Sequence, residues 1–525
     1  MHRHASKIDS PKSQPTDNNY NVVVIGCGHA GLEAALIASK MCPKTIVITA
    51  GGNIGKLSCN PSIGGVSKSQ LVCELCCLGG TIGSISDRVA LAAQLLNASG
   101  HKPANSLRLQ LDKRLYKLLS EHTLTAHKVQ IINAVVTRIK RVPDGFEIKS
   151  EQLNVIKTKT IVLTAGTAAR SVCRIGECSV ALDRLSDKSN DCVYNLFKAH
   201  GVNLKRFKTG TSPRLAKASV CWPAASKNKD VTTKHGFCKA LNRITLNANC
   251  RWTYTNEAVH SLIKANINKT PARSGRLLAK GPRYCLSIED KTLRFGRKPQ
   301  KLIIEPEAAD SNSVYVNGLS TSLPIELQLE LLKLTKAFGS AKMIKAGYAI
   351  EYDCICSNEL KPTLESAKIA NMYTAGQING TTGYEEASVQ GFVAGLNAAA
   401  RALAKREYTF NKQFSYIGTL IDDITNNALS EPYRMLATRA KNRTQLRQRN
   451  AVLRLFPHPL STSLLARCKE LKLVCWMRAS KRFKSKLTSL DSRPIFGNKV
   501  SAILNKLGSL QNSAWQNLIN QQQSS

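Results

Sequence analysis

The stretch NVVVIGCGHAGLEAA, residues 21–35, decides the fold of this chain. Residues 22–25 form a continuous β-branched run, which is typical of a central parallel strand buried on both faces. Three glycines follow at the spacing G-x-G-x-x-G, and a helical pattern begins at residue 32. In such a loop the first glycine makes a tight turn, the second lets the backbone approach a pyrophosphate, and the third lets the helix pack on the strand. We therefore predict a Rossmann-like α/β fold whose loop binds a dinucleotide through Gly26, Cys27, Gly28, His29, Ala30 and Gly31.

The strand before this loop and the helix after it favour dinucleotide binding over an ordinary glycine-rich turn, which is the alternative. One residue of the usual motif is missing. The second expected strand, residues 45–48, runs into Thr49 and Ala50, where an acidic residue would bind a ribose hydroxyl. The ribose must therefore be bound by other residues, and the loop alone does not distinguish FAD from NAD. We expect His29 to make hydrogen bonds within the loop rather than to act in catalysis.

The composition is strongly basic. The 525 residues include 75 Lys and Arg against 35 Asp and Glu, which gives a formal net charge of +40. This balance favours a polyanionic partner such as a nucleic acid, bound through phosphate contacts and counterion release. A general enrichment in lysine is the alternative explanation.

The chain has 17 cysteines, but their arrangement does not indicate a disulfide framework. We see no secretory signal and no apolar run as long as a membrane span, so we expect a cytoplasmic protein with free thiols. The group Cys73-x-x-Cys76-Cys77 could suggest zinc, but a structural zinc site needs four ligands, usually in two pairs, and no suitable second pair exists. We expect these cysteines to pack within a helix, and we predict no metal site.

The order of patterns along the chain suggests five parts. Residues 1–20 are polar and are expected to form a disordered basic extension. An α/β region with strands near 128–139 and 160–164 covers 21–208, and a more basic, less regular insertion covers 209–300. Strands near 301–304 and 313–316, followed by a strand, turn and helix over 372–404, return to the α/β pattern over 301–408. The remaining 409–525 is expected to be basic and helical.

A first candidate site lies in LSCNPSIGG, residues 57–65. Cys59 precedes an Asn-Pro turn, and the two glycines after it can aim N–H groups at a ligand. A cysteine close to a helix N-terminus can be an effective nucleophile or acid. A buried, inert cysteine is an equally good explanation of this stretch alone.

A second candidate site lies in GPRYCLSIEDK, residues 281–291. Its cysteine, Cys285, has charge partners and proton carriers close by in the sequence. A solvated charged turn is the alternative.

A third candidate site lies in AGQINGTTGYEEA, residues 375–387. Its glycines permit a close backbone approach, and a helix that begins near Tyr384 can point its N-terminus at a flavin ring or a phosphate. A long loop without a ligand is the alternative.

Taken together, these stretches resemble the MnmG/GidA family, flavoproteins that modify the wobble uridine of certain tRNAs. The matches run in the family's order over about residues 20–454 and include GCGHAGLEAA at 26–35, SCNPSIGG at 58–65, KTGTSPR at 208–214, GPRYCLSIEDK at 281–291, GYAIEYD at 347–353 and AGQINGTTGYEEA at 375–387. The resemblance implies an FAD-binding core in two parts, an inserted domain for NADH or substrate, and a shortened C-terminal helical domain. It also implies a homodimer that works with tRNA and with the GTPase MnmE.

The resemblance also implies roles for individual residues. The two family cysteines correspond to Cys59 and Cys285, one of which would add to carbon 6 of the uracil while the other serves the proton on carbon 5. FAD would be contacted by the glycine loop together with Val135, Gly376 and Gln377. The NADH site would include Gly281, Pro282, Arg283, Tyr284, Ser287, Ile288, Glu289, Asp290 and Lys291.

This chain departs from the family pattern in places. Residues 182–189 lack the family's loop glycines, Leu286 stands where the family usually has proline, and only about 70 residues follow residue 453. The last difference affects the region that carries tRNA and MnmE contacts in the family, where a basic tail would act electrostatically. Two other functions stay open: a folate- and FAD-dependent tRNA uridine methyltransferase, and an RNA-binding flavoprotein scaffold that has lost catalysis.

Overall fold

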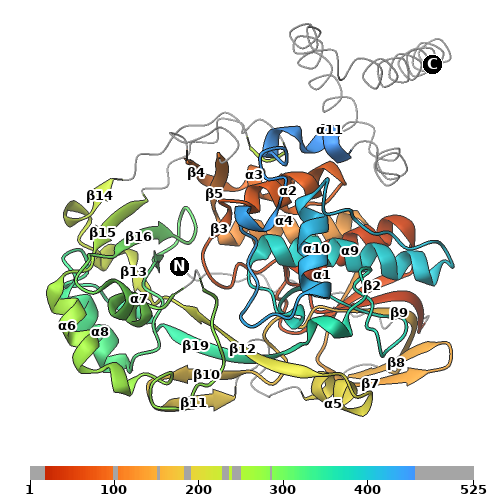
Figure 1. The fold of residues 1–525 in the computed structure, drawn as a ribbon, viewed down its shortest axis with the longest axis horizontal. Helices are drawn as coiled ribbons and strands as arrows, with labels where there is room; N and C mark the ends of the chain where they lie inside the picture. Colours follow the sequence, from red (N-terminus) through yellow and green to blue (C-terminus); the bar gives the residue numbers. More distant parts are fainter. Residues whose placement is uncertain are drawn as a thin grey trace, which may run out of the picture. The chain divides into compact units, whose positions relative to one another are not determined.

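A mostly parallel sheet organises the molecule (Figure 1). The computed structural model describes residues 18–97, 105–150, 154–181, 191–227, 236–238, 250–283 and 286–455, all in one compact unit. The strand order is β6-β2-β1-β9-β8-β7, and β20 pairs with the free end of β9. The strands are β1 (Asn19–Ile25), β2 (Thr45–Thr49), β6 (Gln130–Asn133), β7 (Val136–Val142), β8 (Gly145–Ser150), β9 (Ile156–Leu163) and β20 (Met372–Thr374). The predicted Rossmann-like α/β fold is confirmed, with β1 between β2 and β9 in parallel register.

Two strand limits differ from the prediction. β1 begins at Asn19, which pairs with Lys157, so the last two residues of the expected extension belong to the sheet; residues 1–17 lie outside the described part. The run near 128–139 is two strands, β6 and β7, because the chain leaves the parallel sheet at Ala134 and turns into a hairpin with β8. A continuous apolar pattern does not reveal such a change of partner.

Helices α1 (His29–Met41) and α9 (Tyr384–Ala402) pack closely against each other over this sheet (Figure 1). The contact depends on two glycines of α9. A β-carbon on Gly391 would overlap the backbone of Ala30, and one on Gly395 would overlap the backbone of Ala34. The predicted strand, glycine turn and helix over 372–404 is confirmed as β20 and α9, and the helix begins at Tyr384 as expected.

A small antiparallel sheet, β3-β5-β4, carries the segment that follows Cys59. Its strands are β3 (Ser62–Gly64), β4 (Ala90–Leu96) and β5 (Ser106–Leu111). The helices that accompany it are α2 (Lys68–Cys77), α3 (Ile82–Arg88) and α4 (Lys113–Ala126). Cys59 is therefore followed by a short strand, and the helix expected after Gly64 and Gly65 begins at Lys68.

Two further antiparallel sheets follow in the chain. The first has the order β11-β10-β19-β12, with β10 (Val172–Ile175), β11 (Cys178–Ala181), β12 (Leu204–Thr211) and β19 (Tyr348–Ile355). The second has the order β14-β15-β16-β17-β13-β18, with β13 (Arg214–Ala216), β14 (Ser226–Lys227), β15 (Arg251–Tyr254), β16 (Lys301–Pro306), β17 (Ser313–Asn317) and β18 (Met343–Lys345). The expected strands near 301 and 313 thus exist as β16 and β17.

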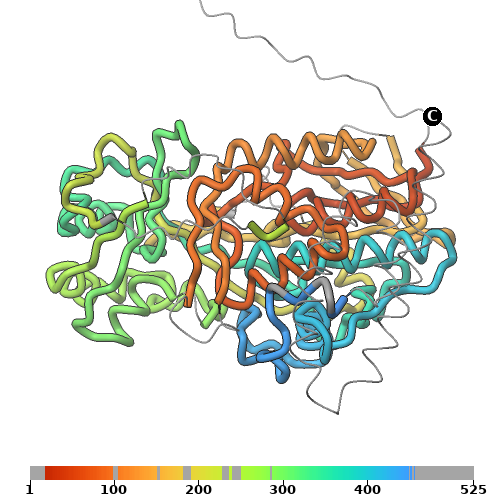
Figure 2. The backbone as a smooth tube through the Cα atoms, turned by 90° about the horizontal axis from the view of Figure 1, so that it is seen from above, coloured from red at the N-terminus to blue at the C-terminus, as the bar shows by residue number. Residues whose placement is uncertain are grey.

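The six-stranded sheet has its own apolar core with helices α6 (Glu257–Ala265), α7 (Ile288–Phe295) and α8 (Ile325–Leu334). In Figure 2 this region is the mainly green part of the backbone at the left of the view. Helix α5 (Cys192–Ala199) instead joins the core of the parallel sheet. The chain enters the six-stranded sheet after β12 and leaves it before β19, and these two strands pair with each other over eight residues, from Leu204 opposite Ile355 to Thr211 opposite Tyr348. The proposed division into 21–208, 209–300, 301–408 and 409–525 stays a prediction.

Buried carboxylates position the helices near the C-terminal end of the described part. Glu74 on α2 accepts hydrogen bonds from the N–H groups of Tyr416 and Ile417, the first residues of α10 (Tyr416–Asn426), at 3.0 Å each. The same carboxylate binds Arg454 of α11 (Ala451–Leu455) at 2.7 Å. The chain beyond residue 455, including most of the predicted basic tail, lies outside the described residues. No helix within the described ranges is long and apolar enough to span a bilayer.

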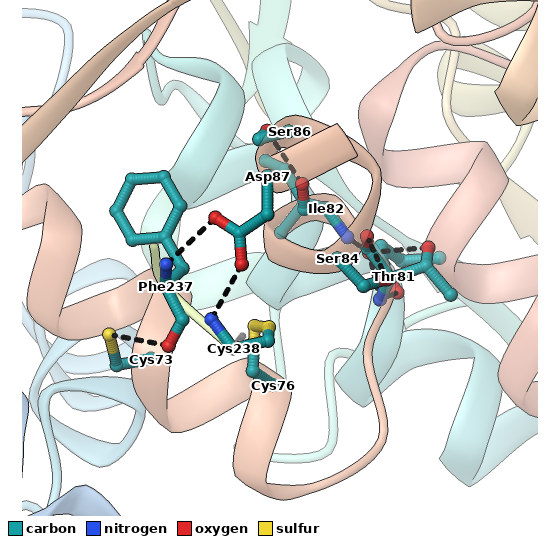
Figure 3. The surroundings of a disulfide bond; sticks show 10 residues. Cys73, Cys76, Thr81, Ile82, Ser84, Ser86, Asp87, Phe237 and Cys238 are labelled. Atoms are coloured by element: carbon teal, nitrogen blue, oxygen red, sulfur yellow. Dashed lines mark hydrogen bonds between the residues drawn. A yellow bond between two sulfur atoms is a disulfide. The ribbon is translucent and has the colours of Figure 1, made fainter. Parts of the chain in front are cut away.

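A disulfide joins Cys76 of α2 to Cys238 (Figure 3). The expectation that all thiols are free is therefore wrong for these two residues, because the sequence does not show that residues 162 positions apart meet. The described turn at 236–238 is also held by Asp87, whose carboxylate accepts hydrogen bonds from the N–H groups of Phe237 and Cys238 at 2.8 Å each. A β-carbon on Gly83 would overlap the Cys76 sulfur, so α3 leaves room for the bond.

We expect Cys238→Ser to lower the free energy of unfolding by about 2–4 kcal/mol under non-reducing conditions, because the disulfide closes a long loop in the unfolded chain. Urea unfolding measures this loss. In dithiothreitol, the free energy of unfolding of the wild-type protein should fall to that of Cys238→Ser. Cys221→Ser, at an exposed thiol, is the matched control. Peptide mapping without reduction should recover the Cys76–Cys238 pair; recovery of both residues as alkylated thiols would contradict the prediction.

Candidate functional site

The glycine loop has the geometry that its sequence predicts. Gly26 has φ +93°, and its N–H donates to the carbonyl of Ile48 at 2.8 Å. Thr164, in the loop after β9, closes the other side, since its hydroxyl donates to the carbonyls of Ile25 and Gly26 at 2.9 and 3.0 Å. A β-carbon on Gly31 would overlap the carbonyl oxygen of Gly26, so helix and strand can approach this closely only with glycine there.

The surroundings of the loop fit a dinucleotide. A β-carbon built on Gly28 meets nothing within 4 Å, so the backbone faces open space where a pyrophosphate would approach. The N-cap of α1 is Gly28, which has no side chain to cap the helix, so the first N–H groups can face an anion. Two buried polar atoms nearby, His29 Nε2 and Thr49 Oγ1, have no hydrogen-bond partner in the described structure. Thr49 ends β2, where the acidic residue of the usual motif is missing.

Among the described residues, His29 Nε2 has no hydrogen-bond partner, so the expected hydrogen bond from this ring atom within the loop is not seen there. Its ring is buried and stacks on the ring of Tyr384 with the centroids 4.4 Å apart. Burial lowers the pKa of His29 to about 4, although the nearby Glu385 carboxylate acts in the opposite direction. The ring is therefore neutral at physiological pH and connects the glycine loop to the start of α9.

This burial predicts a loss of stability in acid. The unfolded chain binds a proton at His29 as the pH falls through about 6.5, but the folded protein does not until about pH 4. Stability should thus fall by about 2 kcal/mol between pH 7.5 and 5, and His29→Asn should lack this part of the pH dependence. Urea unfolding at both pH values measures it, with the exposed His127→Asn as control. Equal pH dependence in wild type and His29→Asn would contradict the assignment.

The other predicted FAD contacts lie at the carboxyl ends of the same parallel strands. Gly376 follows β20 with φ +87°, and its N–H donates to Gln390 of α9 at 3.1 Å. The Gln377 amide lies beside Gly166 in the loop after β9. Val135 links β6 to β7 and is half-buried. Cys27 is buried, and burial raises its pKa to about 12, so it is a neutral thiol.

Cys59 lies in a loop that is held by backbone contacts from two directions. Its N–H donates to the hydroxyl oxygen of Tyr384 at 2.6 Å. Arg214 of β13 donates to the carbonyls of Ser58 and Cys59 at 3.3 and 3.2 Å. The thiol itself is half-buried and lies 3.3 Å from the hydroxyl of Tyr315 on β17.

The loop is also tied to the N-terminus of α9. The N–H of Gly64 donates to the Glu385 carboxylate at 2.7 Å. Lys68 lies 2.9 Å from Glu385 and 2.9 Å from Glu386. Burial would raise the pKa of Glu385, but the Lys68 ammonium and the Gly64 hydrogen bond outweigh it and hold the pKa below the usual value. Glu386 also accepts from the N–H of Met435 at 3.0 Å.

A separate cavity of about 330 Å³ includes part of the predicted NADH segment. Of the predicted residues, those that line it are Gly281, Pro282, Arg283, Ser287 and Asp290. Its other charged side chains are Lys208, Lys280, Arg294 and Glu431. The excess of positive charge suits a phosphate-containing ligand.

The remaining residues of that segment have structural contacts. Ile288 is fully buried in the core of the six-stranded sheet. Glu289 is buried and accepts from the hydroxyl of Thr321 at 2.6 Å and the N–H of Ser322 at 3.0 Å. Lys291 donates to the carbonyl of Gly318 at 2.7 Å. The predicted residues Tyr284 and Cys285 lie outside the described part of the chain.

The structure thus brings the loops at 26–31, 58–65 and 376–387 together around the N-termini of α1 and α9. Tyr315, Lys68 and the role of Arg214 were not predicted from the sequence. Within the described part of the chain, the side chains that contact Cys59 are those of Tyr315, Arg214 and Tyr384, all more than 150 positions away in the sequence. Arg214 and Tyr384 lie in stretches that match the family, whereas Tyr315 does not.

Comparisons with known proteins agree with this arrangement. The family model described as Glucose inhibited division protein A matches residues 21–406. The tRNA uridine 5-carboxymethylaminomethyl modification enzyme MnmG of Campylobacter fetus subsp. fetus is 39% identical over 454 residues, which cover 85% of this chain and 73% of that protein. The protein of the same name from Bacillus velezensis is 39% identical over 83% of this chain and 70% of its own length. The structure of Aquifex aeolicus GidA superposes with a TM-score of 0.80 at 35% identity, covering 89% of this chain and 77% of that one.

Proposed function

Because this chain belongs to the Glucose inhibited division protein A family, we propose that it is an FAD-dependent enzyme that modifies carbon 5 of the wobble uridine of tRNA. The product would carry an aminomethyl or carboxymethylaminomethyl group. The observation that carries the proposal is the position of Cys59, which is held by Arg214 and by Tyr384 of α9, whose ring stacks on His29 of the glycine loop. A half-buried thiol is thus held close to the place where the dinucleotide would bind.

The side chains present suit this chemistry. Carbon 5 of uracil is a poor nucleophile, and a thiolate that adds to carbon 6 makes it enolate-like. Cys59 would supply one of the two cysteine functions, and Cys285 would supply the other. Lys68, Glu385 and Tyr384 keep the Cys59 loop in place. When bound, FAD would supply the hydride chemistry on the one-carbon unit.

We further propose that NADH is the reductant and that it binds in the cavity beside β12. Lys208, Lys280, Arg283 and Arg294 provide positive charge there, which suits a pyrophosphate. Reduction would be seen as loss of the flavin absorbance after NADH is added. Arg283→Glu should raise the NADH concentration needed for half-maximal bleaching by about tenfold or more and leave the FAD content unchanged. An unchanged NADH requirement would remove this cavity from the proposal.

The partners proposed are tRNA, a GTPase of the MnmE type and a second copy of this chain, in the cytoplasm. The net charge of +40 supports binding to tRNA. The MnmE partnership, the homodimer and the cytoplasmic location rest on the family resemblance.

Mass spectrometry of tRNA nucleosides from cells with and without this protein tests the function. We expect the 5-substituted wobble uridine to disappear when the protein is absent and to return when it is supplied. Loss of a methylated uridine in the T-loop instead would identify the methyltransferase alternative. An unchanged set of nucleosides, together with a flavin absorbance that NADH does not bleach, would identify the scaffold alternative.

A further inference from the structure

The hydroxyl of Tyr315 contacts the sulfur of Cys59. The two atoms are 3.3 Å apart, within hydrogen-bonding distance for sulfur. Tyr315 lies on β17 and is almost completely buried, with 3% of its surface exposed. Cys59 precedes the small sheet β3-β5-β4, so the contact joins two regions that are 256 positions apart in sequence. Because buried polar groups in proteins are hydrogen-bonded, the Tyr315 hydroxyl needs a partner, and Cys59 provides one.

Arg214 holds both members of this contact. It is directly opposite Tyr315 in the antiparallel register of β13 and β17, and its guanidinium lies over the Tyr315 ring at 4.8 Å from the centroid. The same guanidinium donates to the carbonyl of Cys59 at 3.2 Å. The ring and the cysteine backbone are therefore positioned by one buried cation.

The protonation state of Tyr315 determines which way a hydrogen bond between its hydroxyl and an ionised Cys59 would run. Burial, followed by the contact with Cys59, raises the pKa of Tyr315 well above its usual value. The phenol keeps its proton at physiological pH, so it can only donate to a deprotonated sulfur. A hydrogen bond to a charged acceptor favours the charged form.

We propose that Tyr315 is a positioning residue that donates a hydrogen bond to the Cys59 sulfur, and so stabilises the thiolate and aims it at the substrate. This inference rests on the proposed catalytic role of Cys59. The titratable and charged groups that face Cys59 are Tyr315 from β17, Tyr384 from α9, Arg214 from β13 and Lys113 from α4. Among them only Tyr315 contacts the sulfur in the described structure.

Tyr315→Phe tests the proposal because it removes only the hydroxyl. In the FAD-bound full-length protein, alkylation of Cys59 by iodoacetamide is followed by peptide mass spectrometry across a pH series. We expect the midpoint of alkylation to rise by about one pH unit. The rate of tRNA modification should fall by about tenfold or more, while FAD content and melting temperature stay unchanged. Tyr254→Phe, at an exposed position, is the matched control.

An unchanged alkylation midpoint in Tyr315→Phe would overturn the proposal. A shifted midpoint with a wild-type rate of modification would also overturn it, since the hydroxyl would then not assist the reaction. Failure of the proposed role of Cys59 looks different, because Cys59→Ser would then retain full modification activity whatever the alkylation profile of Tyr315→Phe. Failure of the proposed function would appear as wild-type protein that modifies no wobble uridine.

Discussion

Replacing Cys59 with serine is expected to reduce tRNA modification by at least about 10³-fold while FAD stays bound. A serine hydroxyl is not ionised at neutral pH, whereas a thiol can be, and only the anion adds readily to carbon 6 of uracil. The substitution is nearly isosteric, and the backbone contacts of Cys59 with Tyr384 and Arg214 do not involve the side chain. The loop should therefore keep its conformation.

The measurement is nucleoside mass spectrometry of tRNA incubated with purified protein, MnmE, the folate one-carbon donor and NADH, together with the flavin spectrum. Cys221→Ser is the matched control, because it makes the same change at an exposed thiol. Cys285→Ser should lose activity to a similar extent. Modification by Cys59→Ser above about one tenth of the wild-type rate would contradict the catalytic assignment.

Local sequence was sufficient to predict the parallel sheet. The apolar run of β1, the glycine spacing after it, and the strand, turn and helix of β20 and α9 are signals within a few residues. The division of residues 128–139 into β6 and β7 was not predictable, because one apolar pattern covers two strands with different partners. The Cys76–Cys238 bond was missed for a related reason, since it depends on two segments that meet only in the folded chain.

Most of the contacts at the candidate site also join segments that are far apart in the sequence, so they were even harder to predict. Sequence stretches identified the Cys59 loop and the start of α9, because both are unusual in composition. They could not identify Tyr315, which lies in an ordinary strand, or the role of Glu33, which binds the N–H groups of Thr81 and Ile82 at the start of α3. A buried carboxylate on one helix that caps another leaves no local pattern, because the partners are 48 positions apart.

Lys68→Ala is expected to lower the free energy of unfolding by about 3–5 kcal/mol at pH 7.5. Lys68 is the cation shared by Glu385 and Glu386, whose side chains are 4% and 0% exposed. Removing it deprives two adjacent buried carboxylates of their shared cation, although the N–H groups of Gly64 and Met435 still donate to them. It also loosens the contact of the Cys59 loop with α9. FAD binding should weaken as well, because Glu385 and Glu386 belong to the loop at 376–387, which is proposed to contact FAD.

The pH dependence distinguishes this cause from a simple loss of packing. In the wild-type protein the pKa of Glu385 is lowered, so its contribution to stability is present above the unfolded value and is lost as the pH falls through the folded value. Without Lys68, burial should instead raise the folded pKa of Glu385. Protonation of the buried carboxylate in acid then removes the cost of burying its charge in the variant. The difference in the free energy of unfolding between wild type and variant should therefore shrink from pH 7.5 to pH 5.

Urea unfolding at the two pH values measures both effects. Lys117→Ala is the matched control, because it removes a lysine from a surface pair with Glu121 and should cost no more than about 0.5 kcal/mol. If Lys68→Ala does not fold, the triple variant Lys68→Met, Glu385→Gln, Glu386→Gln removes the charges together and should recover part of the loss. A cost equal to that of Lys117→Ala, or a difference that grows in acid, would show that the buried cation does not hold the two loops of the site together.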